Sequence, residues 1–257
     1  MTKDRDELYG LHLRGTDRPM PFVNPYRTKG ELNDIEQWKL ERHPLEIADA
    51  IIDTYSKEGP AGIAKIPGEV ERLKWAGIYP QKQGGDAFMM RVKVPGGVLT
   101  ADQAREIGVA ADAFGEGPED SAVFGNRYAD ITTRQTVQIH WLRIEDIPRI
   151  WRRFAAVGLT TVQACGDSAR NVLCCPVSGV DGEEVLDALP VARATGRASK
   201  ASWASTPETG QLKTLRAESP HACTVVRPTA ANRRQIRGMS SMRNQWICTV
   251  WRVVRSA

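Results

Sequence analysis

The sequence has 257 residues, enough for one large domain or two small ones with a buried core. Hydrophobic residues make up 41% and charged residues 26%, the range of soluble globular proteins. The sequence shows no apolar run long enough to cross a bilayer and no secretory signal in its charged first residues, which argues against a membrane protein. The odd number of cysteines, five, without a repeated spacing favours a reducing compartment, so we expect a cytoplasmic protein.

The N-terminal part is predicted to be an arm followed by helices, over residues 1–64. Residues 1–28 are polar and rich in proline, as in an extended arm. Residues 30–56 carry apolar side chains at helical spacing and are interrupted at Pro44.

The segment 88–94 (FMMRVKV) predicts the first strand, because its apolar and polar side chains alternate. Met90 and Val92 would lie on one face, and Arg91 and Lys93 on the other.

Two helices follow at later positions. Thr100 begins the first, which runs to Gly115, and Gln103 completes a capping box with it. Asp146 is predicted to cap the second helix, which ends at Gly158.

Residues 130–141 (DITTRQTVQIHW) predict a second strand with strict alternation. Its polar face would carry five side chains: Thr132, Arg134, Thr136, Gln138 and His140. Together with Arg91 and Lys93 they would form a face rich in cations and hydrogen-bond donors, suited to a polyanion. A simple solvated sheet face is the alternative explanation.

A third apolar run, at 171–177, completes the order strand, helix, strand, helix, strand. This order predicts an α+β fold with a mixed, ferredoxin-like sheet and helices on one face. Cys174 and Cys175 are adjacent in this run, and neighbouring residues of a strand point to opposite faces. We therefore predict two buried cysteines there and no metal site.

Charge and composition change at Thr195. From this residue onward 11 Lys and Arg face 2 Asp and Glu, whereas the preceding residues contain 24 against 29. The segment 195–257 also lacks Phe and Tyr, so it can bury little apolar surface to offset chain entropy. We expect this basic tail to be largely disordered.

Four segments resemble, in this order, the ferredoxin-dependent nitrite and sulfite reductases of the sirohaem and [4Fe–4S] type: KWAGIYPQ, FMMRVKVPGGVLT, DITTRQTVQIHW and ACGDSARNVLCCP. The resemblance covers residues 65–194, which would be a ferredoxin-like half-domain and the start of a sirohaem-binding domain. It implies sirohaem, a carboxylate-rich iron tetrapyrrole, as cofactor. It also implies ferredoxin as electron donor, nitrite or sulfite as substrate, and a monomeric enzyme.

The resemblance also assigns roles to the polar face. Arg91 and Arg170 would be the catalytic residues at the anionic substrate. The residues that would bind sirohaem are Lys93, Thr132, Arg134, Gln138, His140 and Asn171. Tyr79 and Cys165 fall in the same motifs and would support the pocket. Nitrite is preferred as substrate; the alternatives are a fragment of an assimilatory sulfite reductase and a non-catalytic sirohaem-binding fragment.

The resemblance ends near Ala194. The family's longer chains bind the [4Fe–4S] cluster through a C-x5-C pair and a C-x3-C pair in their second half. The five cysteines here are Cys165, Cys174, Cys175, Cys223 and Cys248, and their spacings give neither pair. We therefore expect no metal ligand in this chain and no activity of this half alone. A reading-frame shift or a truncation would produce such a tail, and a genuine alternative C-terminus is the other interpretation.

A nucleic-acid-binding tail is a further hypothesis. Its positive charge would attract phosphate, and Trp203, Trp246 and Trp251 could stack on bases. The sequence carries no accompanying nucleic-acid-binding motif, so we expect neither a nucleic-acid partner nor a membrane.

Overall fold

The computed structural model describes residues 33–81, 85–118, 126–162, 171–184 and 186–201, with two short strands at 224–225 and 252–254. The predicted arm, Cys165, Arg170 and most of the basic tail lie outside these residues. Within the described ranges, no helix is both long and apolar enough to cross a membrane.

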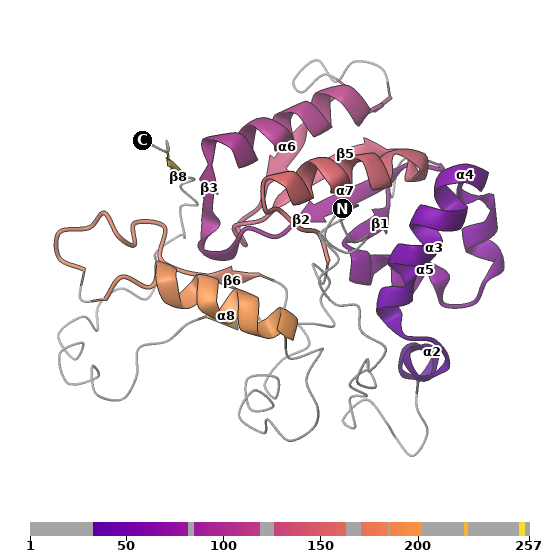
Figure 1. The fold of residues 1–257 in the computed structure, drawn as a ribbon, viewed down its shortest axis with the longest axis horizontal. Helices are drawn as coiled ribbons and strands as arrows, with labels where there is room; N and C mark the ends of the chain where they lie inside the picture. The colour runs from indigo at the N-terminus through magenta and orange to yellow at the C-terminus, as the bar shows by residue number, and fades with distance from the viewer. Residues whose placement is uncertain are drawn as a thin grey trace, which may run out of the picture.

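A four-stranded antiparallel sheet of order β1-β2-β5-β4 lies at the centre of the fold (Figure 1). Its strands are β1 (Ile78–Pro80), β2 (Phe88–Val92), β4 (Ala129–Ile131) and β5 (Val137–Leu142). Two parallel ladders pair β3 (Val98–Thr100) with β8 (Arg252–Val254), and β6 (Val172–Leu173) with β7 (Thr224–Val225). The α+β class and the ferredoxin-like sheet are confirmed.

Two helices, α6 (Ala101–Phe114) and α7 (Ile147–Ala156), lie side by side against the sheet (Figure 1). The predicted capping box is present, because Thr100 Oγ1 accepts from the Gln103 amide at 3.2 Å and Gln103 Oε1 from the Thr100 amide at 3.0 Å. Asp146 is the N-cap residue of α7 as predicted, but its backbone is helical and its side chain makes no capping hydrogen bond. Its carboxylate accepts from Arg149 at 3.2 Å instead.

The core lies between these helices and the apolar face of the sheet. Its largest fully buried side chains come from the strands, from α7 and from the N-terminal helices. They include Met90, Ile139, Leu142, Ile150, Phe154, Ile47 and Ile51. Burying one such side chain contributes roughly 1.5–3 kcal/mol, so this layer dominates the stability of the fold.

Short helices precede the sheet, and they break at Pro44 as predicted. In chain order they are α2 (Asp34–Glu41), η2 (Pro44–Glu46), α3 (Ile47–Ala50), η3 (Ile51–Tyr55), α4 (Ser56–Glu58), η4 (Pro60–Lys65), α5 (Glu69–Leu73) and η5 (Lys74–Ala76). Figure 1 shows α3 and α5 beside β1. Two turns, η6 (Pro95–Gly97) and η7 (Ile144–Asp146), complete the described helical segments outside α8.

Glu69 ties the N-terminal helices together from a fully buried position. Its carboxylate accepts hydrogen bonds from Tyr55 Oη at 2.6 Å, from Arg42, and from Arg72 Nη1 at 3.4 Å. Burial opposes ionisation of Glu69, but the bonds from Arg42 and Tyr55 and the two positive charges outweigh it and lower its pKa. The carboxylate is therefore a charged anchor at the start of α5.

The single strand predicted over 130–141 is wrong, because the chain folds back there into a hairpin. Asp130 of β4 lies opposite Gln138 of β5. The turn is closed by Thr132, whose hydroxyl lies 2.6 Å from the Thr136 hydroxyl, and by Gln135, which has a left-handed φ of 54°. Thr132 and the Arg134 that follows it therefore belong to the turn region and not to one continuous strand face.

Helix α8 (Leu189–Ala201) crosses the point at Ala194 where the resemblance ends. It packs on η6 and β6 (Figure 1), and Ala192 is fully buried in this contact. Gly196 lies against Pro95, since a Cβ added to it would sit 3.1 Å from the proline ring. The domain boundary at Ala194 stays a prediction, and the helix that spans it is part of the described fold.

The two adjacent cysteines are not buried as predicted. Cys175 is exposed and Cys174 is half-buried. Strand β6 ends at Leu173, so the alternation assumed for a longer strand does not reach them.

Candidate functional site

One face of the central sheet carries polar side chains from all four strands. They are Tyr79 of β1, Arg91 of β2, Gln138 and His140 of β5, and Asp130 of β4. In β1, β2 and β5 the apolar neighbours of these residues are buried on the opposite face, against the core: Ile78, Met90, Val92, Val137 and Ile139. The alternation predicted for residues 88–94 and for the second half of 130–141 therefore produces this polar face.

Arg91 is fixed by two neighbours on this face. Its guanidinium lies 4.6 Å from the centre of the Tyr79 ring, and Nη1 donates to Tyr79 Oη at 3.2 Å. Gln138, directly opposite on β5, accepts from Arg91 Nη2 at 3.0 Å in the amide orientation that satisfies its hydrogen bonds. A ring stack and a side-chain bond thus hold the planar cation in one orientation, as a bidentate anion contact requires.

His140 lies on the same face, two residues after Gln138 in β5. Its ring stacks on Tyr128 at 5.2 Å, Nδ1 lies 3.2 Å from Gln81 Oε1, and Nε2 lies 3.0 Å from the Asp130 carboxylate. Burial lowers the pKa of His140, and the nearby Asp130 charge opposes that effect only in part. The ring is therefore a positioned, predominantly neutral donor and acceptor near neutral pH.

Asn171 joins three segments beside this face. Its side-chain oxygen accepts from the Val94 amide at 3.1 Å, and its nitrogen lies 2.9 Å from the Val94 carbonyl oxygen. The same nitrogen contacts the carbonyl oxygens of Arg134 at 3.1 Å and Gln135 at 2.9 Å. The buried amide thus ties the segment after β2 to the hairpin turn and holds the backbone at Arg134 in place.

Gln135 makes a second connection at this turn. It is buried, and its side chain pairs with the backbone of Cys174, donating to the carbonyl at 2.9 Å and accepting from the amide at 3.2 Å. The sequence gives no sign of this role for Gln135, because a polar residue in an alternating run does not indicate a left-handed turn.

The predicted site residues lie in three places: on the polar face, at the hairpin turn, and outside the described residues. Arg91, Gln138 and His140 share the polar face, with Arg91 and Gln138 in contact. Lys93 continues that face but is buried, and its amide donates to Thr160 O at 2.9 Å. The exposed Arg134 lies at the hairpin turn with Thr132 and the buried Asn171, and Arg170 lies outside the described residues.

Tyr128 and Asp130, which were not among the predicted site residues, join the site through His140. Tyr128 and Asp130 could have been predicted only from the pairing of β4 with β5 in the hairpin. Once β4 pairs with β5, Asp130 is brought opposite Gln138 and beside His140.

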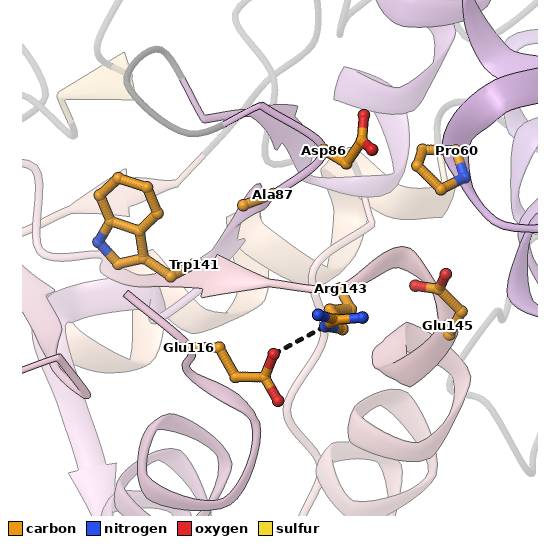
Figure 2. Close-up of a pocket in the computed structure, with 7 residues that line it drawn as sticks. All are labelled: Pro60, Asp86, Ala87, Glu116, Trp141, Arg143 and Glu145. Carbon is orange, nitrogen blue, oxygen red and sulfur yellow. Dashed lines mark hydrogen bonds and ion pairs between the residues drawn. The ribbon is translucent and has the colours of Figure 1, made fainter. Parts of the chain in front are cut away.

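A separate pocket of about 300 Å³ lies near the C-terminal end of β5 (Figure 2). It is lined by Pro60, Asp86, Ala87, Glu116, Trp141, Arg143 and Glu145. Arg143 Nε donates to Glu116 at 2.7 Å, as Figure 2 shows. None of the site residues predicted from the sequence lines this pocket, so it is distinct from the polar face.

The model of the nitrite/sulfite reductase ferredoxin-like half domain matches residues 79–118 and 120–157. The chain carries this half domain of the nitrite and sulfite reductases. The matched residues contain the central sheet, α6 and α7, so the polar face built around Arg91 is a property of the half domain itself.

Relatives of this family match a larger part of the chain. An assimilatory ferredoxin-dependent nitrite reductase of Haloferax mediterranei is 40% identical over 163 residues, which is 61% of this chain and 27% of the relative. Sulfite reductase [ferredoxin] 1 of Mycolicibacterium paratuberculosis is 36% identical, over 66% of this chain and 34% of the relative. The structure of the Mycobacterium tuberculosis NirA protein aligns with a TM-score of 0.56 and 31% identity, over 76% of this chain and 34% of that chain.

The chain thus spans about a third or less of the length of the relatives it matches. The matched share of this chain extends beyond the half domain, in agreement with an N-terminal half of the reductase family.

The donors of the polar face fit a carboxylate-rich tetrapyrrole, which the family binds as sirohaem. Guanidinium, imidazole and carboxamide groups stand on one sheet face and its adjoining turn, and these are the groups that bind carboxylates. The described residues do not fit an iron–sulfur cluster, because they hold no group of three or more His, Cys, Asp or Glu side chains arranged for a metal ion.

Proposed function

We propose that this chain supplies the N-terminal, sirohaem- and substrate-binding half of a cytoplasmic ferredoxin-dependent nitrite reductase, which reduces nitrite to ammonia by six electrons. The observation that carries the proposal is the orientation of Arg91 by Tyr79 and Gln138 on the polar face of the matched half domain. The chain is not active by itself, because its cysteines lack the spacing that the cluster needs.

Each residue of the face has a role in this proposal. Arg91, with Arg170, binds the anionic substrate and stabilises negative charge on it. Arg134, Gln138 and His140 bind carboxylates of sirohaem, and Lys93, Thr132 and Asn171 support the same site. Bound sirohaem would supply the iron at which electrons reach the substrate.

The remaining parts of the reaction would come from the second half of the enzyme. That half would bind the [4Fe–4S] cluster and receive electrons from ferredoxin. The names of the relatives, which include ferredoxin-dependent nitrite and sulfite reductases, support ferredoxin as the donor.

Sulfite is the second candidate substrate. Sulfite reductases of Mycobacterium tuberculosis are 38% identical over 61% of this chain, close to the 40% of the nitrite reductase. Both substrates are small anions that a positioned guanidinium binds, so the residues of the first half favour neither strongly. A non-catalytic sirohaem-binding fragment is the third candidate.

The test is the absorption and EPR spectrum of the purified chain, produced in cells that also make sirohaem. The proposal predicts sirohaem bands without iron–sulfur signals. Adding nitrite or sulfite separately would then show which anion perturbs the sirohaem bands at the lower concentration. A purified chain without any chromophore would contradict the proposal.

A further inference from the structure

Cys174 and Cys175 form a vicinal thiol pair beside the hairpin turn that carries Arg134. Cys175 is exposed, and Cys174 is half-buried with Sγ 3.3 Å from the Gly96 carbonyl oxygen. The pair follows the last residue of β6, so no regular strand forces the two side chains to opposite faces.

The backbone of Cys174 holds the Gln135 side chain in place. Gln135 Nε2 donates to the Cys174 carbonyl at 2.9 Å, and the Cys174 amide donates to Gln135 Oε1 at 3.2 Å. Gln135 itself has a φ of 54°, a conformation that a residue with a side chain keeps only when its surroundings enforce it. These two bonds therefore help to fix the turn next to Arg134.

We propose that Cys174 and Cys175 form a redox-sensitive latch, in which oxidation of the pair to a disulfide releases Gln135 and loosens the Arg134 turn. The structural part of this proposal is independent of any cofactor. Its consequence for sirohaem affinity rests on the proposed function.

The oxidant class is a peroxide, and the reaction balances in two steps. The Cys175 thiolate attacks hydrogen peroxide, an S–O bond forms, the O–O bond breaks, and hydroxide leaves. The Cys174 sulfur then attacks the Cys175 sulfenic acid, the S–S bond forms, and the oxygen leaves as water after taking up protons. The two sulfurs lose two electrons in total, and the peroxide is reduced to water.

The order of the two steps follows from exposure. Burial raises the pKa of the Cys174 thiol, and the neighbouring Cys175 and the carboxylates of Asp187 and Glu184 add to this effect. Cys174 therefore stays protonated while the exposed Cys175 reacts first.

Formation of the disulfide requires the backbone between Cys174 and Cys175 to move. Adjacent α-carbons lie about 3.8 Å apart across a trans peptide, whereas disulfides usually join α-carbons roughly 4.4–6.8 Å apart. The peptide group between the two cysteines has to rotate to bring the sulfurs together. Its carbonyl is the one that accepts from Gln135.

The test is hydrogen exchange of the full chain before and after treatment with hydrogen peroxide, with peptide mapping of the cysteines by mass spectrometry. We expect a mass loss of two hydrogens within the peptide that contains both cysteines. We also expect amide exchange at residues 132–136 to rise about tenfold, and dithiothreitol to reverse it.

Two variants serve as matched controls. Cys175→Ser should abolish the effect of peroxide on residues 132–136, and Gln135→Ala should show the faster exchange without any oxidant. The proposal is overturned if the pair stays reduced, if Cys175 instead links to another cysteine, or if the disulfide forms and exchange at 132–136 does not change. None of these readouts requires sirohaem, so they decide the latch even if the proposed cofactor does not bind.

Discussion

The side-chain nitrogen of Asn171 lies 3.1 Å from the backbone carbonyl oxygen of Arg134, 37 residues earlier in the chain. Together with the hydrogen bonds between Asn171 and Val94, this contact holds the segment after β2, the hairpin turn and the start of β6 against one another. It makes Arg134 the end of a fixed turn and not the tip of a free loop. The geometry of the candidate site therefore depends on one buried amide as much as on its cations.

Replacing Asn171 should destabilise the fold. Asn171→Ala leaves the amide and carbonyl of Val94 and two turn carbonyls without this partner, and each unsatisfied buried group costs about 1–3 kcal/mol. We expect the free energy of unfolding in urea to fall by roughly 3 kcal/mol. Asn126→Ala, at an exposed position, is the matched control and should change it by less than about 0.5 kcal/mol.

Much of this region could be predicted from the sequence, but the hairpin turn and the contacts that hold it could not. The strand with Arg91 was predictable, because the alternation of apolar and polar residues there is set by one buried face. The hairpin was not, because Thr132 to Gln135 contain no Gly, Pro or Asn-Gly turn signal and the alternation continues through them. The long-range contacts of Asn171 have no local signal at all.

The capping box and the cysteines show the same difference between local features and features that depend on the fold. The capping box at Thr100 was predictable because it depends on residues three apart. The position of the cysteines was not, because Cys175 is exposed only through the early end of β6. Sequence resemblance predicted the site residues, whereas the contacts of His140 with Tyr128 and Asp130 and the place of Gln135 in the turn required the fold.

Two glycines of the described fold should respond oppositely to alanine. Gly77 has a φ of 79°, and a Cβ there would lie 2.3 Å from the Thr161 carbonyl oxygen. Gly77→Ala should therefore lower the free energy of unfolding by about 3 kcal/mol or more. Gly108 lies inside α6 with open space around it, so Gly108→Ala should raise it by about 0.5–1 kcal/mol. Equal effects in urea unfolding would contradict the packing described at Gly77.

The stability of the N-terminal helices should depend on pH through Glu69. Its pKa is lowered from 4.5 in the folded chain, so its stabilising effect is complete above that value. The effect is lost as the pH falls through the lower folded value. Glu69→Gln should cost about 3 kcal/mol at pH 7, because it leaves Arg42 and Arg72 without their buried anion.

Unfolding measured at several pH values between 7 and 3 checks this. The difference between wild type and Glu69→Gln should shrink as the pH falls below 4.5. Glu71→Gln, at the half-exposed pair with Lys74, is the control and should show little difference at any pH. A difference that stays constant over this range would contradict a lowered pKa at Glu69.

The orientation of Arg91 should matter more than its charge. Arg91→Lys keeps the positive charge but loses the fork that contacts Gln138 and the stack on Tyr79. In the sirohaem-loaded chain we expect the dissociation constant for nitrite, measured from the absorption bands, to rise about tenfold. Tyr79→Phe keeps the ring stack and should have a smaller effect. Unchanged affinity in Arg91→Lys would remove this residue from the substrate site.

The most direct test of the account is a titration of the purified chain with sirohaem, followed by absorption. We predict saturable binding of one sirohaem per chain, weakened about tenfold or more by Arg134→Ala, because an exposed guanidinium at a fixed turn is lost without harm to the core. Arg105→Ala, an exposed arginine of α6 paired with Asp102, should leave the affinity unchanged. No binding by the wild-type chain, or equal affinities of the Arg134→Ala and Arg105→Ala variants, would contradict the assignment of this surface to sirohaem.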